Sequence, residues 1–419
     1  MRPTLFATRL FIGIFFYVLV IEQTALAAPS SSGLYGLDEV IVLAIERHPS
    51  IAEANGMIAQ QRGERVIAGA YPNPSIKGFF GPGVTREQLG NVSVFERAVI
   101  VNQPLEWPGM RQARQRASDA GVDAAFAGFN DTRLKVSTDA KVAFYQLLLA
   151  QRDVELSTQS LGIVQDLFQS IKARVEAGQA RPFESLKAGV EVQKVSKDLS
   201  RAQNNLVVAR VRLNMGTGGA LGEDFAVRGD FVQSPGDFGL QTLIERSLEQ
   251  HPLIGQLKKQ IEKAGHSVVK ERNSLIPNIT VSGEYHAEAA EKAYLALISV
   301  PIPLWYQRQG EIAAALGTME RAKAERTRSQ NELVTAITEQ VQEARTATQQ
   351  IEVFEKGLLK QADETLRIAR ISFQQGATGL LDLIDAQRVY RQMLLEYAQA
   401  RADLSVALVR LERWTGGVQ

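Results

Sequence analysis

Apolar residues recur at helical spacing in the first part of the chain. Between residues 37 and 70 they fall three or four positions apart, as at Leu37, Val40, Ile41 and Ala44, and the pattern stops before the turn-forming stretch YPNP. This spacing predicts a single helix of about 33 residues, which would be roughly 50 Å long.

Two extended stretches follow the turn, at about residues 75–82 and 92–104, with GPGVTREQLGN between them. Their equivalents in the second part of the chain are about residues 278–286 and 293–303. Alternation is clearest in ITVSGEY, where isoleucine, valine and tyrosine share one face and threonine, serine and glutamate share the other. The pattern predicts four strands with one apolar face and one polar face.

Proline and aromatic residues mark the end of each strand pair. Pro104 and Pro303 cannot donate to a strand ladder, so they are expected to end the second strand of each pair. Trp107, Trp305 and Tyr306 follow at once, where aromatic residues lie at the interface of a membrane barrel.

Very long helical patterns come next, at about residues 109–177 and 309–375. The first contains no proline, and its alanines step by four and three as in a coiled-coil seam. At 1.5 Å per residue such a helix spans on the order of 100 Å. Each pattern ends at a glycine, and a shorter helix is predicted to return over residues 182–214 or 380–413.

The same landmarks occur twice in the same order. IERHPSI aligns with LEQHPLI, and AGQARPFESLKA aligns with QGATGLLDLIDA. We therefore expect one fold made of two similar halves. The expected parts are a signal peptide (1–27), a first repeat (28–219), an equatorial linker that packs outside the helices (220–239) and a second repeat (240–419).

The first residues and the composition narrow the function classes. Arg2 and Arg9 accompany an apolar stretch, and Ala25-Leu26-Ala27 fits a cleavage site, so we expect export. The formal net charge of +1 is too small to create the positive field that attracts nucleic acid, so a nucleic-acid partner is not indicated. Cysteine is absent and the four histidines lack ligand spacing, so no metal site and no cofactor are predicted.

Four strands cannot close a barrel, and an open strand edge cannot lie in lipid. No stretch after the signal peptide has the length of a transmembrane helix. If the chain enters a membrane, it must therefore contribute strands to a shared barrel. Two copies would supply about eight strands and three about twelve, and periodicity does not choose between them.

Taken together, these features resemble the TolC family of outer-membrane efflux proteins over nearly all of the mature chain. The resemblance rests on the repeat order and on YPNPSI, QPLEWPGMRQAR, VPIPLWYQRQGEI and GLLDLIDAQ. The start of the first long helix, with Gly109, Arg111 and Arg114, and the PIPL before the second are most similar to the CzcC-like branch for cobalt-zinc-cadmium resistance.

The resemblance implies a mainly α fold with a membrane β-barrel, in which a trimer forms a 12-stranded barrel above long coiled-coil helices. It implies the outer membrane of a Gram-negative bacterium, with the helices extending into the periplasm. It also implies two partners: a periplasmic adaptor, and an inner-membrane proton-driven pump of the resistance-nodulation-division type.

The resemblance also gives a role to Asp382 and Asp385, whose counterparts face the lumen just inside the periplasmic tip. Three chains would place a ring of carboxylates there, which would attract cations. A local interpretation is compatible, because acids in the first turns of a helix favourably meet its dipole. The equivalent residues of the first repeat are Glu184 and Lys187. A requirement for acids at a helix start therefore explains only one of the two aspartates. Thr378 stands where the best-known family member has an arginine, so the resemblance does not extend to a gate held by that arginine.

The turns at the helix tips resemble the family's adaptor-contact sites. The residues concerned are Gly178, Gln179, Ala180, Gly376, Ala377 and Thr378. Capping by glycine at positive φ is a compatible local interpretation. His48 and His251 each precede a proline at equivalent helix positions, which indicates a structural role for both rather than a metal site.

The hypothesis that follows is a passive exit duct without catalysis, and the resemblance indicates heavy-metal cations of the cobalt, zinc, cadmium or nickel type. An outer-membrane factor for drugs or other organic solutes is the alternative, because related tunnels share these features. A structural coiled-coil protein of the envelope is the rival from another class, and the aromatic residues after the strand pairs argue against it. No nucleophile–base pair, phosphate loop or metal set supports an enzyme.

Overall fold

The computed structural model describes residues 33–87, 90–232, 239–288 and 291–417. The predicted signal peptide and residues 233–238 of the predicted linker lie outside the described residues. The first half contains, in order, β1 (Gly33–Tyr35), α1 (Leu37–Arg47), α2 (Pro49–Gly69), β2 (Ser75–Glu87), β3 (Gly90–Leu105), α3 (Pro108–Glu176) and α4 (Pro182–Gly216).

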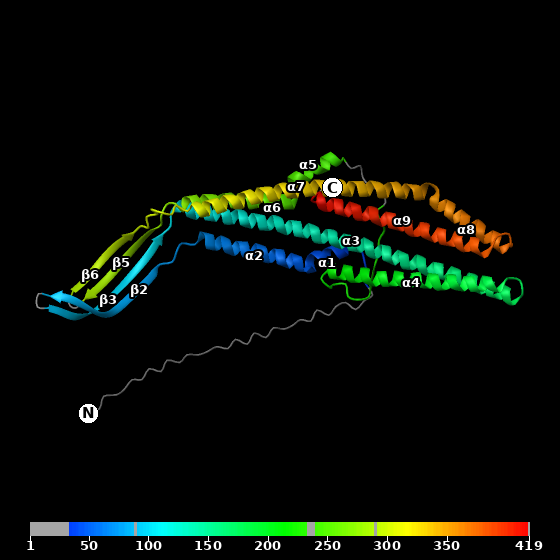
Figure 1. Cartoon of the computed structure of the whole chain (residues 1–419), viewed down its shortest axis with the longest axis horizontal. Coiled ribbons are helices and arrows are strands. Elements are labelled where there is room, and N and C mark those ends of the chain that lie inside the picture. The colour runs from blue at the N-terminus through cyan, green and yellow to red at the C-terminus, as the bar shows by residue number, and fades with distance from the viewer. Residues whose placement is uncertain (1–32, 88–89, 233–238, 289–290, 418–419) are drawn as a thin grey trace, which may run out of the picture. The chain divides into compact units, whose positions relative to one another are not determined.

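The second half repeats the order of helix pair, strand pair, long helix and return helix (Figure 1). Its elements are β4 (Phe225–Val227), α5 (Leu240–Gln250), α6 (Pro252–Asn273), β5 (Ile279–Glu288), β6 (Glu291–Ser299), α7 (Gln309–Val353), the π-helical turn η1 (Phe354–Leu358), α8 (Leu359–Gln374) and α9 (Leu380–Trp414). Among the described residues, no helix is both long and apolar enough to cross a bilayer.

The prediction of one continuous helix over residues 37–70 is wrong, because the helix is broken at His48-Pro49. His48 is extended, with φ −67° and ψ 130°, and a proline disfavours helical backbone at the residue before it. Pro49 fits as the first residue of α2, because an amide hydrogen at that position would have no hydrogen-bond partner within the helix. The same break at His251-Pro252 separates α5 from α6.

The four longer strands form one antiparallel sheet in the order β2-β3-β5-β6. The pairing of β3 with β5, from Glu96 opposite Glu288 to Leu105 opposite Ile279, joins the two halves of the chain. β2 and β6 are the edge strands, and each leaves one row of backbone groups without a strand partner in the described chain.

The strand boundaries differ from the prediction at two places. β2 and β3 continue through most of the predicted loop between residues 82 and 92, and Pro82 is tolerated because β2 is an edge strand. β6 ends at Ser299, so the prediction that this strand continues to Pro303 is wrong. Its partner β5 begins at Ile279, and the last ladder pair is Thr280 with Ser299.

The first predicted long helix is confirmed as α3, which runs unbroken for 69 residues. Its alanine seam is buried where α2 and α6 pack along it, as shown by Ala113, Ala117, Ala120 and Ala124. The second is interrupted at η1, where Gly357 leaves the helical region with φ 177° and ψ −30°. Because a π-helical turn breaks the regular hydrogen-bond ladder, the prediction of an uninterrupted helix to residue 375 is wrong.

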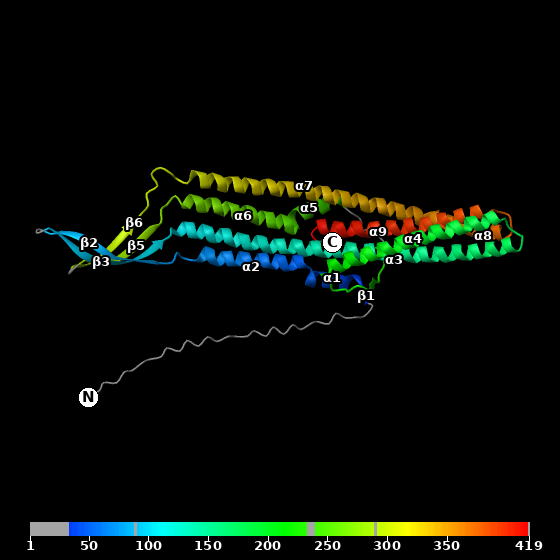
Figure 2. The ribbon, with the colours of Figure 1, turned by 60° about the horizontal axis from the view of Figure 1, so that its bottom comes forward.

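The described part of the linker packs against the helices and contributes to a hydrophobic core cluster with α3. β4 pairs in parallel with β1, with Phe225 opposite Gly33. Phe225 and Phe231 are buried in a cluster with Phe144 and Tyr145 of α3. Figures 1 and 2 show the strands at one end of the described unit and the α3–α4 and α8–α9 turns at the other.

Candidate functional site

The two helix tips have the same backbone geometry. Gly178 and Gly376 have φ of 72° and 73°, the left-handed region that favours glycine. The amide of Gly178 donates to the carbonyl of Val175 at 3.0 Å, and that of Gly376 donates to Phe373 at 3.1 Å. The residue after each glycine bonds one position further back, which completes a Schellman cap at both tips.

The six predicted tip residues are mostly exposed. Gly178, Gln179, Gly376 and Ala377 are exposed, and Ala180 and Thr378 are partly buried. Among the described residues, the Thr378 hydroxyl has no hydrogen-bond partner. The structure therefore presents a polar backbone turn at each tip, and glycine capping accounts for the shape of both turns.

Asp382 and Asp385 point away from the packed side of α9. The carboxylate of Asp382 accepts the amide hydrogen of Gly379 at 3.1 Å and so caps the helix start. Asp385 is 69% exposed and lies 3.5 Å from Arg388 of the same helix. Leu383 and Ile384, between the two acids, are buried. The local helix-start role is thus present for Asp382, and the two carboxylates have separate partners.

The equivalent helix start in the first half has a different chemistry. Glu184 is only partly buried at the start of α4, and its amide donates to the carbonyl of Arg181 at 2.9 Å. The ammonium group of Lys187 lies 4.6 Å from the centroid of the Phe183 ring. One half therefore presents two exposed acids at its tip, whereas the other presents an acid and a base.

The two tip hairpins contact each other through groups that the sequence pattern did not indicate. Arg391 of α9 lies 3.1 Å from Asp198 of α4, and both side chains are partly buried. Arg174 of α3 stacks 5.3 Å from the Phe373 ring of α8. A cleft of about 360 Å³ lies between the hairpins, with Ile384 among its lining residues. Asp198 and Arg391 are 193 residues apart, so no local signal could pair them.

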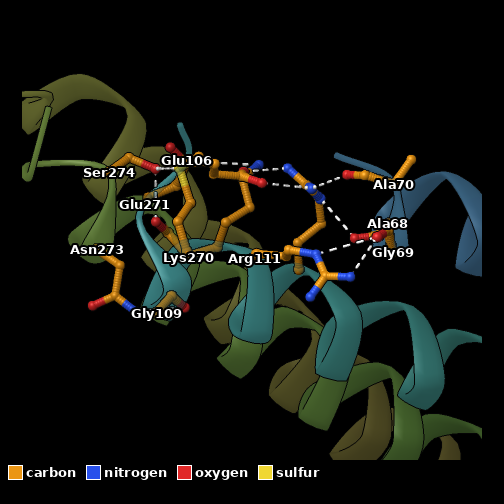
Figure 3. A network of polar contacts seen from close by, with 12 residues as sticks. Ala68, Gly69, Ala70, Glu106, Gly109, Arg111, Lys270, Glu271, Asn273 and Ser274 are labelled. Carbon is orange, nitrogen blue, oxygen red and sulfur yellow. Dashed lines mark hydrogen bonds and ion pairs between the residues drawn. The ribbon is translucent and has the colours of Figure 1, made fainter. Parts of the chain in front are cut away.

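The junction between strands and helices is held by arginines (Figure 3). Arg111 donates to the carbonyl of Gly69 at 2.7 and 3.1 Å, and Arg114 donates to those of Ala68 and Ala70. Arg114 also forms a bidentate pair with Glu106, whose side chain is only 2% exposed. Arg111 and Arg114, which the sequence links to a family only by resemblance, thus bind the terminal carbonyls of α2.

The corresponding junction in the second half uses a carboxylate instead. Arg308 has a left-handed backbone, with φ 57°, and its guanidinium lies 2.5 Å from Glu271 at the end of α6. Lys270 lies 2.8 Å from the same carboxylate. Burial alone raises the pKa of Glu271, but the hydrogen bonds from Lys270 and Arg308 outweigh it and hold this pKa below its ordinary value.

The three predicted interface aromatics lie beside these junctions. Trp107 is 45% exposed at the start of α3. Trp305 is 91% exposed in the segment between β6 and α7. Tyr306 is 56% exposed, and its hydroxyl donates to Glu311 at 2.5 Å.

His48 and His251 each cap a helix, and only His251 is buried. Nδ1 of each accepts an amide hydrogen two residues on, at 3.1 Å in both cases. Nε2 of His251 lies 3.1 Å from the carbonyl oxygen of Arg413, whose guanidinium lies 2.8 Å from Asp131. Burial, followed by the charge of Arg413, lowers the pKa of His251. Within the described ranges, no three histidine, aspartate or glutamate side chains are grouped so that they could hold a metal ion.

The sequence pattern that describes an outer membrane efflux protein matches residues 40–219 and 243–417. The chain belongs to the outer membrane efflux protein family. This confirms the family, the mostly helical TolC-like fold with four antiparallel strands, and a non-enzymatic channel in the outer membrane that extends into the periplasm. Channels of this family form trimers in tripartite efflux systems.

Individual relatives of this efflux protein are distant in sequence. The chain is 24% identical over 388 residues to the cobalt-zinc-cadmium resistance protein CzcC of Cupriavidus metallidurans, covering 92% of this chain and 91% of that protein. It is 21% identical to nodulation protein T of Rhizobium leguminosarum bv. trifolii, over 87% and 81% of the two chains. The solved Campylobacter jejuni CmeC outer membrane channel superposes with a TM-score of 0.78 at 14% identity, over 91% and 85% of the chains.

Proposed function

We propose that this efflux channel is a homotrimeric exit duct for heavy-metal cations of the cobalt, zinc, cadmium or nickel type. In this proposal a periplasmic adaptor and an inner-membrane proton-driven pump deliver the cations to its helical end. The observation that carries the proposal is an open four-stranded sheet with one exposed apolar face, attached to long helices whose second tip presents two exposed carboxylates.

The sheet supports a shared barrel. The sheet has four antiparallel strands, so its edge strands β2 and β6 run in opposite directions. β6 of one copy can therefore pair with β2 of the next copy and extend the sheet. Most exposed apolar residues of the sheet lie on one face, as shown by Ile76, Phe80, Val99 and Ile298. Three copies would close about twelve strands around an open lumen.

The helix tips support a channel entrance whose charged residues come from the second half of the chain. With threefold symmetry, Asp382 and Asp385 would supply six carboxylates, arranged around the axis by the capped start of α9. The exposed turns at Gly178-Gln179-Ala180 and Gly376-Ala377-Thr378 are the proposed adaptor contacts, and Trp107, Trp305 and Tyr306 are the proposed interface aromatics. We also propose the boundaries that the sequence predicts, namely a signal peptide (1–27), a first repeat (28–219), a linker (220–239) and a second repeat (240–419).

The cation cargo is favoured by CzcC, the relative named for resistance to metals, and by the acidic second tip. Organic solutes are the second candidate, because a relative named for nodulation is similar over a comparable length. A channel can serve either cargo, since a duct need not bind what passes through it.

A deletion strain tests the cargo. We expect loss of tolerance to cobalt, zinc, nickel or cadmium, restored by the wild-type gene and less well by Asp382→Asn/Asp385→Asn. Glu184→Gln, at the equivalent first-half position, serves as the matched control and should restore tolerance fully. Unchanged metal tolerance in the deletion strain, together with new sensitivity to organic toxicants, would overturn the metal cargo in favour of the second candidate.

A further inference from the structure

The cleft between the two tip hairpins has the size and the apolar lining of a small-molecule site. Its volume is about 360 Å³, within the range of pockets that hold small organic ligands. Val164 of α3 and Leu383 and Ile384 of α9 line it, and all three are buried. Each of the four tip helices, α3, α4, α8 and α9, contributes lining residues, so a bound molecule would contact both hairpins.

A buried amide oxygen in the lining of this cleft lacks a hydrogen-bond donor. Gln387 of α9 is 7% exposed and lines the cleft. Within the part of the chain that the structure describes, its Oε1 accepts no hydrogen bond. Because a buried acceptor without a donor is unfavourable, a ligand that donates a hydrogen bond to this oxygen would gain affinity.

Four charged groups of the cleft form no ion pair among the described side chains. They are two cations and two carboxylates, namely Arg174, Arg370, Asp166 and Glu191. By contrast, Arg388 and Arg391, which also line the cleft, pair with Asp385 and Asp198. Two positive and two negative charges of the lining are therefore available to a ligand.

The unpaired charges are separated along the hairpins. At about 1.5 Å per residue, Arg174 lies roughly 3 Å from the tip end of α3, and Arg370 lies roughly 6 Å from that of α8. Gln387 lies roughly 10 Å from the tip end of α9. Glu191 of α4 and Asp166 of α3 lie further away, at roughly 14 and 15 Å. The cleft is therefore positive near the tip and negative further from it, and the amide oxygen lies between the two charged zones.

We propose that this cleft binds a small zwitterion, in which a carboxylate and an ammonium group lie at opposite ends of a short apolar body such as one aromatic ring. The carboxylate meets Arg174 and Arg370, and the ring lies against Leu383 and Ile384. The ammonium group donates to Oε1 of Gln387 and points toward the two carboxylates of the cleft. All the lining residues belong to one chain, so this inference does not depend on the proposed trimer or its cargo.

Isothermal titration calorimetry tests the proposal with 4-(aminomethyl)benzoate as the probe. Purified mature protein in detergent is titrated, and a titration of detergent alone is subtracted. We expect saturable binding of the probe. Binding of 4-methylbenzoate, which lacks the ammonium group, and of 4-methylbenzylamine, which lacks the carboxylate, should be weaker by about tenfold or more.

Two variants locate the binding site. Arg370→Gln should weaken binding of the probe about fivefold or more, because it removes a charged partner of the carboxylate. Gln387→Leu should remove the advantage of the probe over 4-methylbenzoate, since both then lack a partner for the ammonium group. Arg370 is exposed, so its variant keeps the test available if Gln387→Leu does not fold.

Arg367→Gln is the matched control, because Arg367 is an exposed arginine of the same helix that does not line the cleft. It should bind the probe as the wild-type protein does. Absence of saturable binding, or the same affinity in Arg370→Gln and Arg367→Gln, would overturn the proposed site. Either result would leave the proposed duct in place.

Discussion

The two halves of the chain share an order of elements but differ in local chemistry. The first half has an unbroken long helix and a tip with Glu184 and Lys187, and the second has a helix interrupted at η1 and a tip with Asp382 and Asp385. The repeat therefore maintains the architecture, whereas single substitutions give each half its own electrostatics. Features that both halves share at equivalent positions are the ones that the fold requires, and charged residues present in only one half are specific to that half.

Substitutions at the strand–helix junctions should change the stability of the fold the most. Arg114→Met should lower the free energy of unfolding by about 3 kcal/mol, because it leaves Glu106 buried without its bidentate partner. Arg308→Met should cost roughly 1 kcal/mol, since Arg308 is 36% exposed and its partner Glu271 keeps Lys270. Thermal unfolding followed by circular dichroism would compare the two. Equal losses would contradict the distinction between the junctions.

The second effect concerns the two capping histidines and pH. The pKa of His251 is lowered in the folded protein, so below about pH 6.5 the unfolded chain binds more protons and stability falls as pH decreases. Because a single imidazole is involved, its contribution to the slope cannot exceed about 1.4 kcal/mol per pH unit. We predict that His251→Asn flattens the dependence of the unfolding midpoint between pH 7.5 and 5.5, and that His48→Asn leaves it in place. The reverse pattern would be inconsistent with the buried Arg413 contact.

A smaller effect is expected at the helix starts behind the tips. Asp382→Ala should cost about 1 kcal/mol, because it removes the carboxylate that accepts the Gly379 amide hydrogen. Glu184→Ala should cost only a few tenths of a kcal/mol, as expected for a charge near a helix dipole. Hydrogen exchange at Gly379 provides the local measurement, and unchanged protection in Asp382→Ala would refute the capping role.

Features that depend on local periodicity could be predicted from the sequence. The alanine seam of α3, the two-faced strands and the glycine-ended tips follow from spacing, so their positions were predictable. The break at His48-Pro49 was also locally encoded, but the helical pattern on both sides concealed it. Such breaks are visible only when proline geometry is weighed above periodicity.

Other features depend on distant parts of the chain and left no local signal. Arg391 meets Asp198 only because two hairpins pack together, and the burial of His251 requires Arg413 from the last helix. The turn at η1 interrupts a helix whose apolar spacing continues through it, so the pattern predicted no break. The candidate acids were identified by resemblance, and their exposure and separate partners became known only from the structure.

We propose that the second-half tip attracts cations into a passive duct. Planar bilayers containing mature protein would measure it directly, through the reversal potential in a salt gradient. We predict cation-selective conductance that falls clearly in Asp382→Asn/Asp385→Asn and is unaltered in Glu184→Gln. Conductance with the same selectivity in all three proteins would contradict the claim.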